Sequence, residues 1–125
     1  MQLDRRNIVR TFTRCATLRC PACGRAGIVQ RPFTIRETCP ACGVLFKREE
    51  GFFVGAILVN TVTTEIVILT VYLIAVAAAL DVSRALLLTL LALAVTFPVL
   101  FYHHSWSIWL GFDHLVESLP KPPAT

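Results

Sequence analysis

Four cysteines form the clearest chemical signal in the sequence, because they fall into two nearly identical motifs. Residues 20–24 and 39–43 both read Cys-Pro-Ala-Cys-Gly, and fifteen residues separate the two Cys-x-x-Cys pairs. Such a turn directs two thiolates at one metal ion, with proline fixing its start and glycine allowing the positive φ that follows. Two turns together supply a tetrahedral ligand set. The predicted metal ligands are Cys20, Cys23, Cys39 and Cys42.

Thiolate tetrahedra suit both zinc and iron, so two metals stay open. Rubredoxins also use paired knuckles of this kind, but their knuckles are usually further apart. Zn²⁺ is therefore the expected cofactor, and iron is the alternative. A site closed by four protein ligands leaves no position for a catalytic water, which favours a structural role. Cys15 lies outside both motifs and is expected to be a free thiol.

A small domain over residues 18–50 must position these cysteines. Two short apolar stretches, 28–29 and 33–35, flank an Arg-Pro pair and predict a β-hairpin. The segment is too small to bury a core, so metal binding should supply most of its folding free energy. Residues 1–17 are expected to form a basic N-terminal arm.

Charge and hydropathy divide the chain into a basic head and an apolar body. Residues 1–50 carry ten basic and four acidic side chains, whereas residues 51–125 carry two and four. Two apolar runs, at about 54–80 and 85–104, meet the roughly 20 residues that a membrane-spanning helix needs. The expected fold is an all-α hairpin of two transmembrane helices over residues 51–105, preceded by a small β zinc ribbon with rubredoxin-like knuckles.

The link between the two runs is short enough to place both termini on one side of the bilayer. Basic residues concentrate before the first helix, with Lys121 after the second and Arg84 alone in the link. The positive-inside rule therefore predicts a multi-pass protein of the inner membrane with both termini in the cytoplasm. We find no secretory signal peptide. A cytoplasmic head keeps cysteines reduced, which favours metal binding over disulfides.

One carboxylate, Glu65, interrupts the first apolar run. A charged group in a membrane helix is costly and marks a candidate functional residue. Counting outward from the link places it within about one helical turn of His103 and His104. Three interpretations stay open: Glu65 reaches water or stays protonated, pairs with one of the histidines, or handles protons or ions. The candidate intramembrane polar residues are Asn60, Glu65, His103 and His104.

Residues 106–119 alternate apolar and polar side chains at helical spacing. They predict an interfacial amphipathic helix that continues from the second membrane helix or lies beside it. Pro120 ends this helix, and residues 120–125 are expected to form a flexible tail. His114 and Glu117 share one face, which makes a second metal site conceivable, although a solvated or interfacial face is the favoured interpretation.

Several motifs, taken in order, resemble a known bacterial family. After the cysteine motifs come Glu49-Glu50-Gly51-Phe52, Gly55-Ala56, Asn60, Phe101-Tyr102 and Trp109-x-x-x-Asp113. Over residues 18–119 the chain resembles DUF983, bacterial zinc-ribbon membrane proteins of unknown function. Many members carry an Asp-Gly-Pro-Ala-like motif where this chain has Glu-Gly-Phe-Phe, as another branch does. The resemblance implies the architecture and no reaction, and some members are encoded near terminal oxidase genes, which implies respiratory-complex assembly.

The sequence favours a non-catalytic accessory or assembly protein that acts through protein–protein contacts. No Ser/His/Asp arrangement, phosphate loop or nucleotide fingerprint occurs in it. The expected partners are the lipid bilayer and either other membrane-protein subunits, such as those of a respiratory-type complex, or further copies of the chain. No small-molecule substrate is identified. An enzyme or transporter would depend on a short set of side chains: Glu65, His103, His104, Asp113, His114 and Glu117.

Two alternative functions remain open. The first is an iron-loaded, rubredoxin-like electron carrier at the membrane. The second is a membrane-tethered zinc ribbon that binds nucleic acid, because its arginines suit phosphate contacts. Nucleic acid is the less favoured partner, since the head carries few aromatic residues on which bases would stack.

Overall fold

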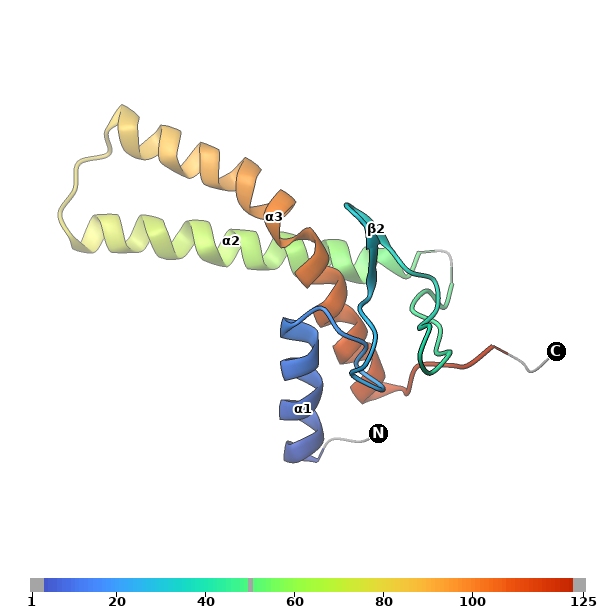
Figure 1. The fold of residues 1–125 in the computed structure, drawn as a ribbon. Helices are drawn as coiled ribbons and strands as arrows, with labels where there is room; N and C mark the ends of the chain where they lie inside the picture. The colour runs from blue at the N-terminus through green and yellow to red at the C-terminus, as the bar shows by residue number, and fades with distance from the viewer. Residues whose placement is uncertain (1–3, 50, 123–125) are drawn as a thin grey trace. The chain divides into compact units, whose positions relative to one another are not determined.

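The computed structural model describes residues 4–49 and 51–122. Its elements, in chain order, are α1 (Arg5–Ala16), β1 (Val29–Arg31), β2 (Thr34–Ile35), α2 (Phe53–Ala77) and α3 (Arg84–Val116) (Figure 1). The chain divides into two compact units. The first, here the cysteine unit, contains residues 1–59 and 103–125, and the second, here the helix-pair unit, contains residues 60–102. Helices α2 and α3 therefore contribute to both.

The N-terminal arm contains a helix that the sequence analysis did not predict. Thr11 and Cys15 are buried on one face of α1, one turn apart. That face packs on α3: the Ser107 hydroxyl donates a hydrogen bond of 2.8 Å to the Cys15 carbonyl. A Cβ atom at Gly111 would lie 2.5 Å from the Cys15 Sγ atom, so α1 approaches α3 where the latter has no side chain.

The predicted β-hairpin is confirmed. β1 and β2 are antiparallel, with Val29 opposite Ile35, and Phe33 turns the chain with a φ of 60°. Ile28, Ile35 and Phe46 are buried, with 0%, 3% and 0% of their surface exposed. These few apolar side chains are the core of the segment at 18–48, here called the cysteine segment.

A single helix, α3, covers the residues for which two elements were predicted. The expected transmembrane helix at 85–104 and amphipathic helix at 106–119 join without a break, and the helix ends at Val116 rather than at residue 119. Trp106, Leu110 and Leu115 are buried in the cysteine unit. Of the predicted flexible tail, residues 123–125 lie outside the described part of the chain, as does Glu50 in the Glu-Glu-Gly-Phe motif.

In the helix-pair unit, α2 and α3 run antiparallel and are joined by the link at 78–83 (Figure 1). The Asn60 Nδ2 atom donates a hydrogen bond of 3.0 Å to the carbonyl of Pro98, which lies inside α3. Both helices are long and apolar enough to cross a membrane. Of the most apolar 18 residues in each, 6% in α2 and 0% in α3 are buried. The unit therefore leaves most of its apolar surface uncovered.

Candidate metal centre

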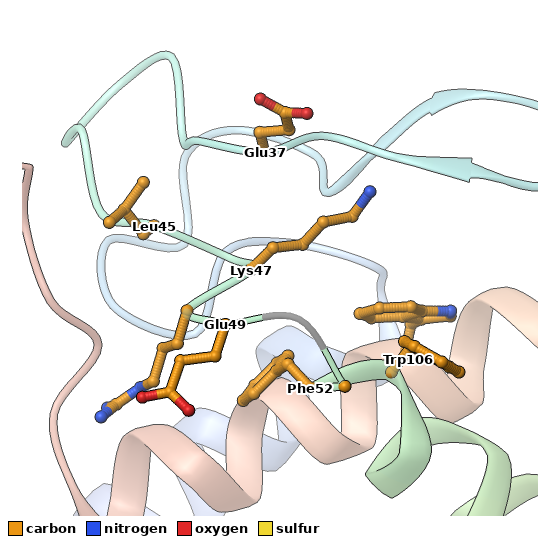
Figure 2. Close-up of a pocket in the computed structure, with 9 residues that line it drawn as sticks. Glu37, Leu45, Lys47, Glu49, Phe52 and Trp106 are labelled. Atoms are coloured by element: carbon orange, nitrogen blue, oxygen red, sulfur yellow. The ribbon is translucent and has the colours of Figure 1, made fainter.

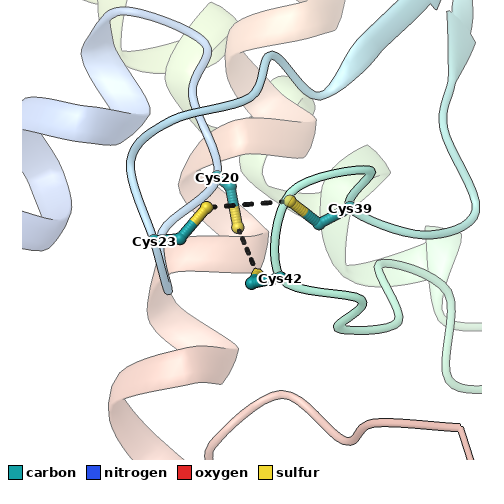
Figure 3. Close-up of side chains that lie close together, drawn as sticks. All are labelled: Cys20, Cys23, Cys39 and Cys42. Atoms are coloured by element: carbon teal, nitrogen blue, oxygen red, sulfur yellow. Dashed lines mark hydrogen bonds between the residues drawn. The ribbon is translucent and has the colours of Figure 1, made fainter.

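The four cysteine sulfurs form a compact cluster, with all Sγ atoms within 4.8 Å of one another. The Sγ atoms of Cys20 and Cys42 lie 3.8 Å apart, and those of Cys23 and Cys39 lie 3.7 Å apart (Figure 3). A tetrahedron with metal–sulfur bonds of about 2.3 Å has sulfur–sulfur edges of about 3.8 Å. The cluster therefore fits one four-coordinate ion, as the sequence predicted.

The two knuckles repeat the same backbone hydrogen bonds. In the first, the Gly24 N–H donates to the Cys20 carbonyl at 2.8 Å, and the Cys20 N–H donates to the Ala26 carbonyl. In the second, the Gly43 N–H donates to the Cys39 carbonyl at 2.9 Å, and the Cys39 N–H donates to the Val44 carbonyl, one residue closer than in the first knuckle. Both glycines have positive φ, 69° and 75°, so the chain turns back where a side chain would be strained.

Burial and hydrogen bonding act differently on the thiols. Burial raises the pKa of Cys20 and of Cys42 above the ordinary thiol value. Burial acts in the same direction on Cys23, but the backbone N–H groups of Arg25 and Ala26 and the thiols of Cys39 and Cys42 lower the pKa of Cys23 to about 6. The thiols of the cluster therefore differ in how readily they lose a proton. The positive charge of a bound divalent cation would favour the thiolate form of all four.

Arg14 braces the first knuckle from α1. Its Nη1 atom donates to the Pro21 carbonyl at 3.0 Å and to the Ala22 carbonyl at 2.9 Å. A Cβ atom at Gly24 would lie 2.6 Å from the Arg14 Nε atom, so the glycine provides both the turn and the space for this guanidinium. The sequence analysis counted Arg14 among the basic residues that set topology and did not detect this role, since nothing local ties it to the knuckle.

Comparison with known families gives one match. A family model described as "Protein of unknown function (DUF983)" matches residues 29–114. The chain belongs to the DUF983 family. No curated protein and no solved structure matches the chain. The DUF983 match includes Cys39 and Cys42 and begins after Cys20 and Cys23.

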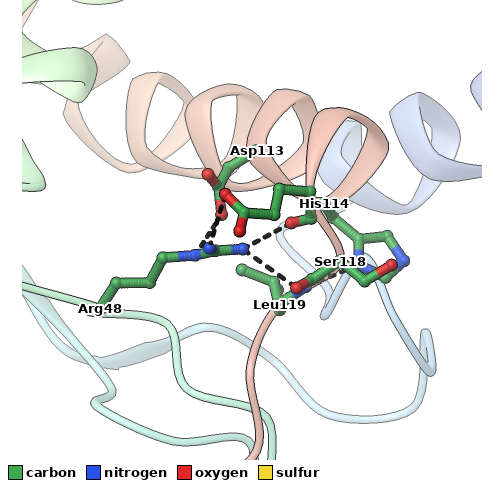
Figure 4. Close-up of polar contacts among 6 residues, drawn as sticks. Arg48, Asp113, His114, Ser118 and Leu119 are labelled. Atoms are coloured by element: carbon green, nitrogen blue, oxygen red, sulfur yellow. Dashed lines mark hydrogen bonds and ion pairs between the residues drawn. The ribbon is translucent and has the colours of Figure 1, made fainter. Parts of the chain in front are cut away.

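Arg48 ties the end of the cysteine segment to the end of α3 in this DUF983 protein (Figure 4). Its Nε atom lies 3.0 Å from an oxygen of Asp113, and its Nη1 atom lies 3.1 Å from an oxygen of Glu117. Its Nη2 atom donates to the carbonyls of Glu117 and Ser118. A cation here satisfies carbonyls at the helix C-terminus and complements the helix dipole. Burial raises the pKa of Asp113 even though Arg48 acts to lower it.

His114 and Glu117, the conceivable second metal site, are engaged in other contacts. The Nδ1 atom of His114 accepts a hydrogen bond of 3.4 Å from the Leu119 N–H, and Glu117 pairs with Arg48. Burial, together with the charge of Arg14, lowers the pKa of His114. These contacts compete with metal coordination. They favour the interpretation that the two residues contribute to contacts at the C-terminus of α3.

The predicted intramembrane polar residues fall into different units. Asn60 and Glu65 belong to the helix-pair unit, where Asn60 bonds to Pro98 and Glu65 is exposed. His103 belongs to the cysteine unit, where its Nε2 atom accepts a hydrogen bond of 3.3 Å from the Phe33 N–H and its ring stacks on that of Phe33. His104 is in the same unit. Pairing of Glu65 with a histidine therefore stays a prediction.

A groove of about 750 Å³ lies between the cysteine segment, the first residues of α2 and the cysteine-unit part of α3 (Figure 2). Phe52 and Trp106 line it with aromatic rings whose centroids are 6.4 Å apart. Four charged side chains of both signs also line it: Glu37, Lys47, Arg48 and Glu49. Phe53 completes the apolar part and remains 50% exposed. Sequence analysis did not detect this groove, because its walls come from three separate stretches of chain.

Proposed function

We propose that this DUF983 protein is a membrane-anchored accessory protein that binds another membrane-protein subunit and performs no catalysis of its own. The supporting observation is the uncovered apolar surface of α2 and α3, of which almost none of the central residues is buried. Apolar surface on this scale requires lipid or a protein partner. Inner-membrane location with both termini in the cytoplasm, as the basic residues favour, belongs to the same proposal.

The cysteine cluster serves this function as a structural zinc site. Cys20, Cys23, Cys39 and Cys42 would hold Zn²⁺, which supplies the folding free energy that the few buried apolar residues of the cysteine segment lack. Four thiolates close the coordination sphere and leave no position for substrate. The metal thus shapes a binding surface on the cytoplasmic side.

Two surfaces suit a protein partner. Along the helix pair, small side chains such as Ala92 and Ala94 allow a neighbouring helix to approach closely. A second apolar surface, within the cysteine unit, is the groove lined by Phe52, Phe53 and Trp106. The partner would be one subunit of a larger membrane complex, of the respiratory type that the family resemblance favours. Its membrane helix would pack along the helix pair, and the cytoplasmic segment that follows that helix would bind in the groove.

A photocrosslinking experiment tests this function. The photoreactive residue p-benzoylphenylalanine replaces Phe53 in the groove or, as a control, Val82 in the link between α2 and α3. In native membranes we expect a single protein adduct from position 53, and purification of that protein should in turn recover this chain. A chain that purifies alone as a monomer, with adducts to lipid at both positions, would contradict the proposal.

A further inference from the structure

A second cavity, of about 360 Å³, lies beside the first cysteine knuckle within the cysteine unit. Its walls come from α1, from the knuckle and from the last turns of α3. The polar side chains that line it are Asn7, Arg10, Thr11, Arg14, Cys23, Arg25 and His114. No carboxylate is among the described residues that line it. We call this cavity the arginine pocket.

Helix geometry explains how one short element supplies most of the pocket. Asn7, Arg10, Thr11 and Arg14 follow one another at spacings of three, one and three residues, which places all four on one face of α1. Arg25 directly follows the first knuckle and also lines the pocket. The pocket therefore brings together three guanidinium groups from two separate parts of the chain.

The charge of the pocket is not neutralised by the protein. The ion pairs in the described part of the chain involve Arg48, so neither Arg10 nor Arg25 has a carboxylate partner there. The Nη1 atom of Arg14 donates hydrogen bonds to two carbonyls, and these neutral acceptors leave the positive charge of Arg14 in place. Four thiolates around a divalent ion carry a net charge of about −2, and three guanidinium groups still leave the site positive. Arginines held close together without counter-charge attract an anion.

His114 adds a neutral donor to this set. Burial and the neighbouring Arg14 charge both lower its pKa, so the imidazole is neutral near pH 7. Its Nδ1 atom accepts a hydrogen bond from the Leu119 N–H, which assigns the remaining proton to Nε2. The pocket thus contains groups that donate hydrogen bonds, and the hydroxyl of Thr11 and the amide of Asn7 are suited to the same role.

We propose that the arginine pocket binds a phosphate group that carries two negative charges. Guanidinium groups match phosphate oxygens with paired, charge-assisted hydrogen bonds, which single-point cations do not provide. The volume is near the lower end of the range for ligand pockets, about 300–1,000 Å³, and suits a phosphate or diphosphate with a small substituent. A soluble phosphate compound and a phosphatidic acid headgroup share this chemistry, and the experiment separates them.

Isothermal titration calorimetry on the full-length, zinc-loaded protein in a maltoside detergent, which contains no phosphate, tests the proposal. The two probes are inorganic pyrophosphate and dihexanoyl phosphatidic acid, each titrated separately. We expect saturable binding of one equivalent, weakened at least tenfold by Arg10→Gln and by Arg25→Gln. The matched control is Arg31→Gln, which removes the same charge from an exposed position on β1, outside the pocket.

The outcomes are distinct. Binding that depends on Arg10 and Arg25 and not on Arg31 supports the proposal, and the probe that binds tighter identifies the source of the phosphate. Absence of saturable binding by either probe overturns it, as does an equal loss in all three variants, because that would reveal a general charge effect. Zinc content, measured for each variant, should stay at one equivalent, so a loss of binding is not a loss of fold. The accessory role proposed above stands or falls independently of this result.

Discussion

The cysteine unit and the helix-pair unit are stabilised in opposite ways. In the cysteine unit, residues far apart in sequence make specific polar contacts, such as Ser107 with the Cys15 carbonyl and Arg48 with Asp113. In the helix-pair unit, Asn60 donates a hydrogen bond to the Pro98 carbonyl of the other helix, and almost none of the most apolar residues in either helix is buried. Polar contacts between distant residues connect the parts of the first unit, whereas the second unit leaves its apolar helices uncovered.

The difference predicts that metal removal unfolds one unit and spares the other. Chelation, or Cys39→Ser, should remove the folding free energy of the cysteine segment, for which structural zinc sites supply roughly 10–16 kcal/mol. Trp106 and Trp109, both in the cysteine unit, should report the loss by fluorescence. Far-ultraviolet circular dichroism in detergent should retain most of its helical signal from α2 and α3.

Restoring Zn²⁺ to the chelated protein should recover the tryptophan emission, and elemental analysis should give one zinc per chain. A coloured protein with one iron per chain would instead assign the site to iron. Tryptophan emission that is unchanged after complete chelation would contradict the division between the two units.

A smaller effect is expected from a single methyl group between α1 and α3. In Gly111→Ala the new Cβ atom would lie 2.5 Å from the Cys15 Sγ atom, which forces the helices apart at a cost of about 1–3 kcal/mol. The measurement is the alkylation of Cys15, which is 1% exposed and whose pKa burial raises. It should become at least several-fold faster.

Gly27→Ala is the matched control, because its Cβ atom would meet its nearest neighbour at an ordinary 3.8 Å. Cysteine alkylation in Gly27→Ala should resemble that of the unchanged protein. Equal rates in all three proteins would show that the contact between α1 and α3 contributes little to the cysteine unit.

Replacement of Arg48 should weaken the same unit by about 2 kcal/mol, since Arg48→Gln loses charge-assisted hydrogen bonds to the end of α3. The pH dependence sharpens this test. Burial raises the pKa of Asp113 in the folded state, so the folded protein binds the proton more tightly and this group lowers stability as pH rises above about 4. Without Arg48 the decline should become steeper.

Thermal unfolding followed by tryptophan fluorescence, between about pH 4 and pH 7, measures this slope. Asp113→Asn in the Arg48→Gln background should flatten it, because the buried carboxylate is gone. If Arg48→Gln and the unchanged protein show parallel curves, the ion pair does not stabilise the charged form of Asp113.

The smallest effect is expected in the helix-pair unit. Asn60→Leu removes the hydrogen bond to the Pro98 carbonyl, and such bonds contribute on average about 0.6 kcal/mol between membrane helices. Thr70→Val is the control, since the Thr70 hydroxyl bonds within its own helix to Ile66. Resistance to denaturing detergent should fall slightly for Asn60→Leu alone, and tryptophan emission should change in neither variant.

Local patterns were sufficient to predict the cluster of four cysteines, the β-hairpin around residue 32 and the two apolar helices. Each of these depends on spacing or composition within a short stretch. For residues 106–119 the sequence left open whether the amphipathic helix continues from the second membrane helix or lies beside it, and the structure shows one continuous helix.

Contacts between distant residues could not be predicted in the same way. Arg14 was one of ten basic residues in the basic head, and its contacts with the Pro21 and Ala22 carbonyls join parts of the chain that the local sequence does not connect. Arg48 and Asp113 are 65 residues apart, and a single sequence carries no sign that they meet. The groove and the arginine pocket have the same origin, because each is lined by several separated segments.

The packing of Cys15 on the last turns of α3 has a consequence for biosynthesis. Ser107 and the Cys15 carbonyl are 92 residues apart in a chain of 125. Helix α1 therefore has no docking surface until the residues around Ser107 in α3 have been synthesised. Until then the Cys15 thiol and the face of α1 that packs on α3 stay uncovered, so the docking of α1 is a late folding event rather than the first.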